Sequence, residues 1–119
     1  MEKENIIAVL SFDFAPAIIG LYKTLLSKKE YVLSKQLLRS GSGIGANVEE
    51  AIAAQTKKDF TAKMSIASKE ARETRYWLRL LDRSRLIEED FSPYLNKIEI
   101  IIKILTKIVK TAQLRTSAK

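Results

Sequence analysis

The sequence predicts an all-α protein that folds as an antiparallel, up-down-up-down four-helix bundle. The 119 residues include only four Gly and two Pro, too few for the turns of a sandwich or barrel of short strands. Ala, Leu, Ile, Lys, Glu and Arg, which favour helices, are abundant. Apolar residues recur at intervals of three and four in four successive segments, as in a helical bundle. The length fits one domain over residues 1–119.

The first expected helix covers residues 11–27. Ser11 can cap its free amides, and Pro16 lies close enough to this start to be tolerated or to kink the helix. Four apolar residues on one face are spaced by four, three and four: Phe14, Ile18, Leu21 and Leu25.

The second expected helix covers residues 31–54 and contains a glycine cluster at positions 41, 43 and 45. A loop between two helices is the alternative, but the apolar spacing keeps its phase across the cluster, as in Leu37, Gly41, Ile44 and Val48. We therefore expect one helix, whose glycines let a neighbouring backbone approach closely. Residues 41–46 also match the dinucleotide pattern Gly-x-Gly-x-x-Ala, but no strand precedes them, so we expect no dinucleotide site.

The third and fourth expected helices cover residues 57–84 and 93–113. Thr56 and Asp59 form a start that resembles a capping box. Ser92 is expected to cap the fourth helix, with Pro93 at its first position. The third segment keeps the spacing of three and four without a break and is the clearest helix in the chain, and the fourth segment repeats the same spacing.

The chain contains no Cys and no His. This excludes Ser-His-Asp and Cys-His nucleophilic sites, His-type metal centres and imidazole bases, the commonest routes to catalysis at neutral pH. Glu49 and Glu50 are adjacent and project about 100° apart on a helix, a poor geometry for a carboxylate pair. We therefore expect no enzymatic activity, no cofactor and no metal.

We expect no membrane partner, because no uncharged apolar stretch reaches the ~20 residues of a spanning helix. Residues 6–10 are apolar and residues 15–17 resemble a cleavage site. However, residues 2–4 are net negative and Asp13 interrupts the apolar run, so we do not expect a signal peptide. The cytoplasm is the expected location.

The net charge of +7 arises entirely after residue 56, where fifteen basic residues face eight acidic ones. On the third helix four arginines, at positions 72, 75, 79 and 83, lie within about 80° of one another, with Tyr76 at their margin. Guanidinium groups bind phosphate in a bidentate manner and a tyrosine ring can stack on a base, but a solvated face with local ion pairs is an equally good interpretation. The candidate nucleic-acid-binding residues are Lys57, Lys58, Arg72, Arg75, Tyr76, Arg79 and Arg83.

Two helices carry more apolar residues than one bundle core requires. The apolar residues of the fourth helix cover an arc of about 220°, and the third helix has an apolar flank away from its core-facing positions. A wide core with a few exposed apolar residues is one explanation, and a homo-oligomer interface is the one we favour. The candidate interface residues are Ile66, Trp77, Leu80, Ile100, Ile101, Ile104 and Ile108.

Two motifs, residues 44–51 (IGANVEEA) and residues 70–78 (EARETRYWL), resemble a family of four-helix bundles. This family includes the protein encoded in the 23S ribosomal RNA intervening sequence, and the resemblance extends from Ser11 onward. Gly43 departs from its pattern, which usually has a hydroxyl residue there.

The resemblance implies a homopentameric ring and no established catalytic role. The similar accessory protein of diversity-generating retroelements is thought to bind nucleic acid and a reverse transcriptase. A role in nucleic-acid binding is implied by this resemblance for five residues only: Lys57, Lys58, Arg72, Arg75 and Tyr76. We therefore expect a non-enzymatic, homo-oligomeric module that binds RNA or DNA. The alternative is a protein-protein scaffold or accessory subunit, with an unidentified protein partner and no direct nucleic-acid contact.

Overall fold

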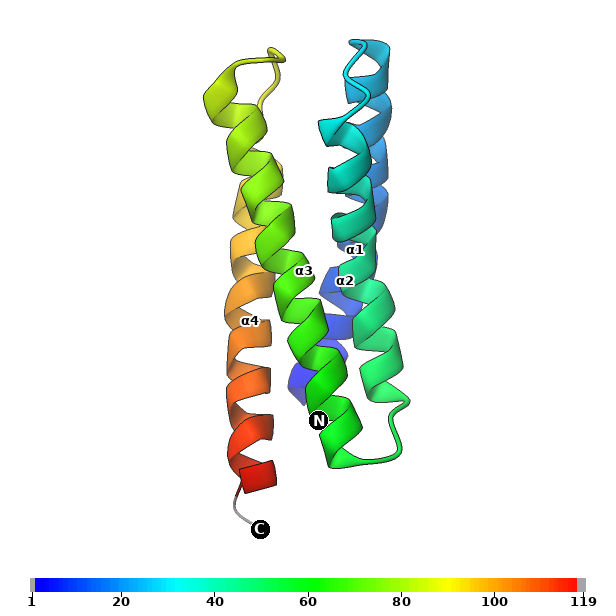
Figure 1. Cartoon of the computed structure of the whole chain (residues 1–119), viewed down its shortest axis with the longest axis vertical. Helices are drawn as coiled ribbons and strands as arrows, with labels where there is room; N and C mark the ends of the chain where they lie inside the picture. The colour runs from blue at the N-terminus through cyan, green and yellow to red at the C-terminus, as the bar shows by residue number, and fades with distance from the viewer. Residues whose placement is uncertain (1, 118–119) are drawn as a thin grey trace.

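The computed structural model of the chain describes residues 2–117, and these form four helices and no strand. The helices are α1 (Glu2–Ser27), α2 (Leu33–Ile52), α3 (Lys57–Ser84) and α4 (Ser92–Ser117). They run up, down, up and down, so that the α1–α2 and α3–α4 loops share one end of the bundle and the α2–α3 loop lies at the other (Figure 1). The expected four-helix bundle is confirmed.

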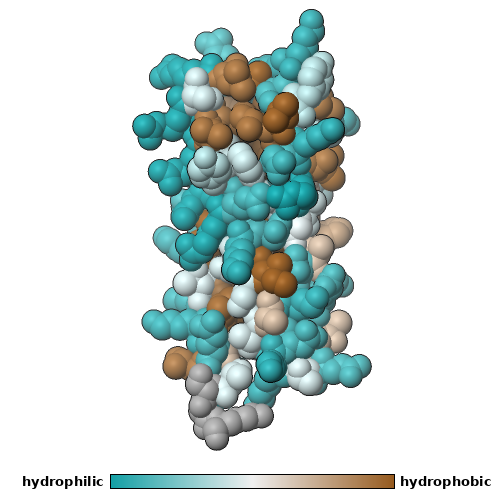
Figure 2. All heavy atoms as spheres, viewed as in Figure 1, coloured by the Kyte–Doolittle hydropathy of each residue, from teal (hydrophilic) through white to brown (hydrophobic). Residues whose placement is uncertain are grey.

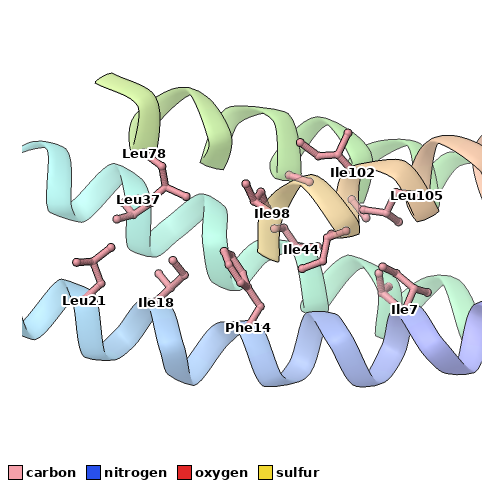
Figure 3. Close-up of a cluster of buried hydrophobic side chains, with 14 of the residues drawn as sticks. Ile7, Phe14, Ile18, Leu21, Leu37, Ile44, Leu78, Ile98, Ile102 and Leu105 are labelled. Atoms are coloured by element: carbon pink, nitrogen blue, oxygen red, sulfur yellow. The ribbon is translucent and has the colours of Figure 1, made fainter. Parts of the chain in front are cut away.

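Each helix packs against two others. α1 contacts α2 and α4, and α3 contacts the same two helices, so α1 and α3 lie diagonally across the bundle. The core along the bundle axis contains side chains from all four helices (Figure 3). Its largest fully buried members include Phe14, Leu37, Leu78 and Ile98, one from each helix. The apolar spacings of the sequence therefore do mark the inward faces.

The first helix begins nine residues earlier than expected. Ser11 is not a cap: it is buried within α1, and its hydroxyl donates a hydrogen bond to the backbone O of Ala8. Ile7 is also buried and lies one turn before Ser11, so the core-facing pattern extends toward the N-terminus. Pro16 consequently lies inside α1 rather than near its start.

Over Ile6–Ser27, near the N-terminus, α1 is by length and composition alone apolar enough to cross a membrane. Core helices of soluble proteins and N-terminal signal sequences have the same property, and 28% of the most apolar part of α1 is buried in the bundle. In the bundle its inward face is buried against the other helices.

The glycine cluster lies inside α2, which continues through all three positions, so the expectation of one helix is confirmed. A Cβ atom at Gly45 would lie 3.3 Å from the backbone O of Ser11, and one at Gly41 would lie 3.0 Å from a side-chain carbon of Ile18. These two glycines therefore permit the close approach of α1 and α2. Next to them, the buried hydroxyls of Thr74 and Ser40 form a hydrogen bond of 2.9 Å that connects α3 to α2.

The start of α2 is capped by Glu30, which precedes the helix. Its carboxylate accepts hydrogen bonds from the backbone N–H groups of Val32, Leu33 and Ser34, at 3.1, 3.0 and 2.6 Å. The Ser34 hydroxyl donates in return to the Glu30 backbone O. Amides at a helix N-terminus lack partners within the helix, so a buried carboxylate satisfies them and favours the positive end of the helix dipole.

The bounds of α3 agree with the expected ones, and the Thr56 hydroxyl accepts from the backbone N–H of Asp59 at 3.0 Å, as expected for its cap. The start of α4 differs from the expectation. Ser92 is the first helical residue rather than the cap, and its backbone N–H donates to the Asp90 carboxylate. Hydrogen bonds from the side chain and backbone of Ser92 lower the pKa of Asp90.

Candidate nucleic-acid interface

The arginines of α3 project away from the core because they alternate with buried positions. Ala71, Thr74 and Leu78 are buried, whereas Arg72 and Arg79 are exposed. Arg83 is also exposed and lies in the last turn of α3. The expected stripe of arginines is therefore present on the outward side of α3.

Contacts with α4 determine how this stripe is oriented. The Arg72 guanidinium donates to the Thr106 hydroxyl at 3.0 Å, and the Arg75 guanidinium forms an ion pair with Glu99 at 3.0 Å. These contacts place the stripe beside the outer surface of α4, where three exposed lysines flank Thr106 in sequence. We call the combined surface the basic face. Its residues are Arg72, Arg75, Arg79 and Arg83 of α3 and Lys103, Lys107 and Lys110 of α4.

The four arginines are not equivalent. Arg75 is neutralised by Glu99, and its side chain is only 26% exposed. Among the described side chains Arg79 and Arg83 form no ion pair, and they line a shallow depression of about 480 Å³ together with Tyr76, Leu80 and Ser84. Figure 2 shows the face on which α3 lies in front: hydrophilic residues cover most of it, and a hydrophobic cluster lies toward the end with the α3–α4 loop.

Tyr76 and Trp77 connect this depression to α2. Their rings form an edge-to-face pair with centroids 5.1 Å apart. The Trp77 indole N–H donates to the Glu73 carboxylate at 3.0 Å, and Glu73 also forms an ion pair with Arg39 of α2. Trp77 is therefore partly buried and anchored, whereas Tyr76 is 58% exposed.

A second carboxylate, Glu70, lies beside this network. Burial raises its pKa, the neighbouring Glu73 raises it further, and Arg39 lowers it. A Cβ atom at Gly43 would lie 2.7 Å from the Glu70 carboxylate, so the missing side chain at Gly43 gives Glu70 its space. A side chain at position 43, where the resembling family usually has a hydroxyl residue, would require the flexible end of Glu70 to shift.

Lys57 and Lys58 are exposed in the first turn of α3, at the opposite end of the helix from Arg83. At 1.5 Å per residue, Lys58 is about 32 Å from Arg79 along the helix axis. The structure therefore does not bring these lysines together with the depression, and only a long ligand would reach both.

Two of the candidate interface residues are core residues. Ile101 and Ile108 are only 2% and 4% exposed, because α4 packs between α1 and α3 and its wide apolar arc is covered from both sides. Expecting them at an outer surface was wrong. Trp77, Leu80 and Ile104 are partly buried, and only Ile66 and Ile100 are exposed.

A second apolar surface lies on α1, and the sequence reasoning missed it. Val9, Phe12 and Ile19 are exposed, Phe12 to 73%, on the side of α1 opposite its buried residues. A groove between α1 and α4 adjoins this surface and is lined by Leu10, Asp13, Phe14, Lys97, Ile100 and Ile101. The spacing of residues 9, 12, 16 and 19 at three, four and three was the available signal.

Among the side chains described, those of residues 6–116, no group of three or more Asp and Glu residues has a geometry that could hold a metal ion. The Gly-x-Gly-x-x-Ala segment lies within a helix and not in a strand-to-helix loop, so it lacks the geometry of a dinucleotide site.

The family model described as 23S rRNA-intervening sequence protein matches residues 3–107. Among solved structures, the chain is similar to the crystal structure of a protein of unknown function from the S23 ribosomal protein family of Bacteroides thetaiotaomicron. The two share 47% sequence identity with a TM-score of 0.86, over 91% of this chain and 98% of the other. No curated protein matches the sequence.

Proposed function

The chain belongs to the 23S rRNA-intervening sequence protein family, and on this premise we propose that it is a non-enzymatic, homo-oligomeric helical module that binds RNA or DNA through the basic face. One observation carries the proposal: Arg72 contacts α4 at Thr106, between Lys103 and Lys107, so cations of two helices adjoin there, and further along α3 Arg79 and Arg83 have no acidic partner among the described side chains. Phosphates neutralise such a surface, and guanidinium groups bind them in a bidentate manner.

The contacts would be to the nucleic-acid backbone, with little dependence on base sequence. Base-specific recognition in a duplex requires side chains that enter a groove, whereas the basic face is the side of a packed helix pair. Lysine and arginine contacts to phosphate fix position and affinity instead.

Oligomerisation is supported by the apolar surface of α1 and the adjoining groove. A helix that is apolar on both its inner and outer sides is stable when both are buried, and here only the inner side is covered by the bundle. We propose that another copy of the chain covers Val9, Phe12 and Ile100. The number five comes from the resemblance described above.

The same apolar surface also favours the second candidate function, a scaffold or accessory subunit that binds another protein. In that case α1 would contact the partner, and the basic face would remain solvated. The two proposals differ in their response to salt, because phosphate contacts weaken steeply with ionic strength whereas burial of apolar area does not.

The test is a titration of a labelled RNA hairpin and a DNA duplex with the purified protein, followed by fluorescence anisotropy at several salt concentrations. We expect binding at low salt and a linear fall of log affinity with log salt. In the Arg79→Gln/Arg83→Gln variant the salt slope for the duplex should fall by about 1.8 for each protomer in contact, since each phosphate contact contributes about 0.9.

The matched control is Lys23→Gln/Lys35→Gln, which removes two exposed cations from α1 and α2 outside the basic face. This variant has the same net charge as the arginine variant and should retain the wild-type slope. If the salt slope fell equally in both variants, the nucleic acid would be attracted by the net charge of the protein alone and not by the basic face. Absence of binding to either probe at low salt would refute the proposed function.

A further inference from the structure

The depression at the end of the basic face combines two cations with an exposed aromatic ring. Arg79 and Arg83 follow Tyr76 by three and seven residues, so their Cα atoms lie about 4.5 and 10.5 Å further along the axis of α3. All three side chains line the same depression. We infer that Tyr76 stacks on an unpaired base while Arg79 and Arg83 bind phosphates of the same strand, so that the basic face binds single-stranded nucleic acid better than a duplex. This inference rests on the proposed function and specifies its ligand.

The ring of Tyr76 is both accessible and held in place. Its contact with Trp77 is edge-to-face, and Trp77 is itself fixed by the hydrogen bond to Glu73. An aromatic ring that is already oriented loses little conformational freedom when a base stacks on it. This anchoring, together with an exposure of 58%, distinguishes Tyr76 from a side chain that merely covers a neighbouring helix.

The two guanidinium groups both lie on the C-terminal side of Tyr76, and this gives the strand a direction across the site. Arg79 and Arg83 make no ion pair among the described side chains, whereas Arg75 on the far flank is bound to Glu99. A strand whose base lies on Tyr76 would therefore extend toward the C-terminal end of α3. Leu80, which also lines the depression, offers apolar surface between the two arginines.

A duplex cannot use this combination. Its bases are stacked inside the helix and present only their edges, so it can use Arg79 and Arg83 but not the face of Tyr76. An unpaired segment can use all three residues, since every base has a face that stacks on an aromatic ring. The arrangement thus predicts a preference for strand type with little preference for base sequence.

The experiment compares three probes of equal length: a single-stranded oligoadenylate, an RNA duplex, and an abasic strand that keeps the phosphates but lacks the bases. Affinities are measured with the intact wild-type protein and with Tyr76→Ala and Tyr76→Phe. Tyr76→Ala should weaken oligoadenylate binding by about 5- to 150-fold, the range for one base stacked on one aromatic ring. It should leave duplex and abasic-strand binding within about twofold. Tyr76→Phe should retain the wild-type affinity for all three, because it keeps the ring.

Two further measurements locate the effect. Tyr31 is 55% exposed in the α1–α2 loop, so Tyr31→Ala removes a tyrosine of similar exposure outside the basic face and should bind like wild type. Trp77 is the only tryptophan, and its ring lies 5.1 Å from that of Tyr76, so its fluorescence should change on addition of oligoadenylate and stay constant with the abasic strand.

The outcomes separate this inference from the proposed function. If oligoadenylate and duplex bind equally and Tyr76→Ala alters neither, the stacking site is refuted while phosphate binding by the basic face stands. If Tyr31→Ala weakens oligoadenylate binding as much as Tyr76→Ala does, the stacking site is also refuted. If no probe binds at low salt, the proposed function itself fails. Circular dichroism of Tyr76→Ala shows whether the variant is folded. If it is not, the fluorescence of Trp77 in the wild-type protein decides, because an equal response to oligoadenylate and to the abasic strand would refute stacking.

Discussion

Replacement of Gly45 by Leu tests the close approach of α1 and α2 on which the fold depends. A Cβ atom at this position would already lie 3.3 Å from the backbone O of Ser11. That oxygen cannot rotate away, so the rest of a leucine side chain would have to displace α1. Overpacking of this kind costs about 1–3 kcal/mol, and the better helix propensity of Leu returns about 0.8 kcal/mol. We therefore expect a net loss of up to about 2 kcal/mol in the free energy of unfolding.

Urea unfolding followed by circular dichroism measures this loss, at one fixed protein concentration because the proposed association between copies would also stabilise the folded state. The transition midpoint should fall while its slope stays the same. Gly20 in α1 provides the control, since a Cβ atom there would have no neighbour within 4 Å. Gly20→Ala should therefore gain about 0.5–1 kcal/mol from helix propensity alone. Gly45→Ala should increase the free energy of unfolding by less than Gly20→Ala does. The difference between these two increases measures the cost of the contact between the new Cβ atom and Ser11.

The reasoning would be refuted if Gly45→Leu were as stable as the wild type, because the two helices could then not be in contact at this position.

Four other variants test three separate features. Glu70→Gln removes a carboxyl whose pKa is raised by burial and by Glu73, so the ionised group destabilises the wild type. In urea unfolding, the stability advantage of Glu70→Gln over the wild type should therefore grow as the pH rises above the ordinary pKa of 4.5, and it should disappear at lower pH. Glu30→Ala removes the cap of α2 and should cost about 1–2 kcal/mol in the same assay. Ile100 is exposed, so Ile100→Glu should dissociate the proposed oligomer and keep the helical circular dichroism. Ile101 is buried in the core, so Ile101→Glu should unfold the chain. A molecular mass in solution equal to that of one chain would refute oligomerisation of the wild type.

Local sequence signals determined most of the helices. α3 has an uninterrupted spacing of three and four, a hydroxyl cap and an acidic residue in its first turn, and its bounds were predicted correctly. The start of α1 was missed because Ser11 is a residue type that serves equally well as a cap or as a small buried residue. The deciding signal was Ile7, which continues the inward face one turn earlier. Similarly, Glu30 caps α2 from outside the helix, and standard cap patterns do not include that position.

The surface was harder to predict because it depends on how the helices pack. The apolar arc of α4 was correctly identified, but a single helix cannot show that α1 and α3 cover its two sides and bury Ile101 and Ile108. Likewise, the pairing of Arg75 with Glu99 depends on the register of α3 against α4, across 24 residues of sequence. The stripe of arginines followed from sequence spacing, whereas the division into paired and unpaired arginines needed the structure.

The division into paired and unpaired arginines determines where on the basic face an anion would bind most strongly. Arg72 and Arg75 already donate to Thr106 and Glu99, so a phosphate would have to replace existing partners. Arg83 lies in the last turn of α3, where the negative end of the helix dipole already favours a cation. Arg79 has neither an ion pair among the described side chains nor a place at a helix end. It is therefore the arginine whose charge is least compensated within the subunit, and it lies one turn from the exposed ring of Tyr76. Because an uncompensated guanidinium group loses no existing partner when it binds phosphate, the affinity of the basic face should be concentrated at this end of α3 rather than spread evenly along it.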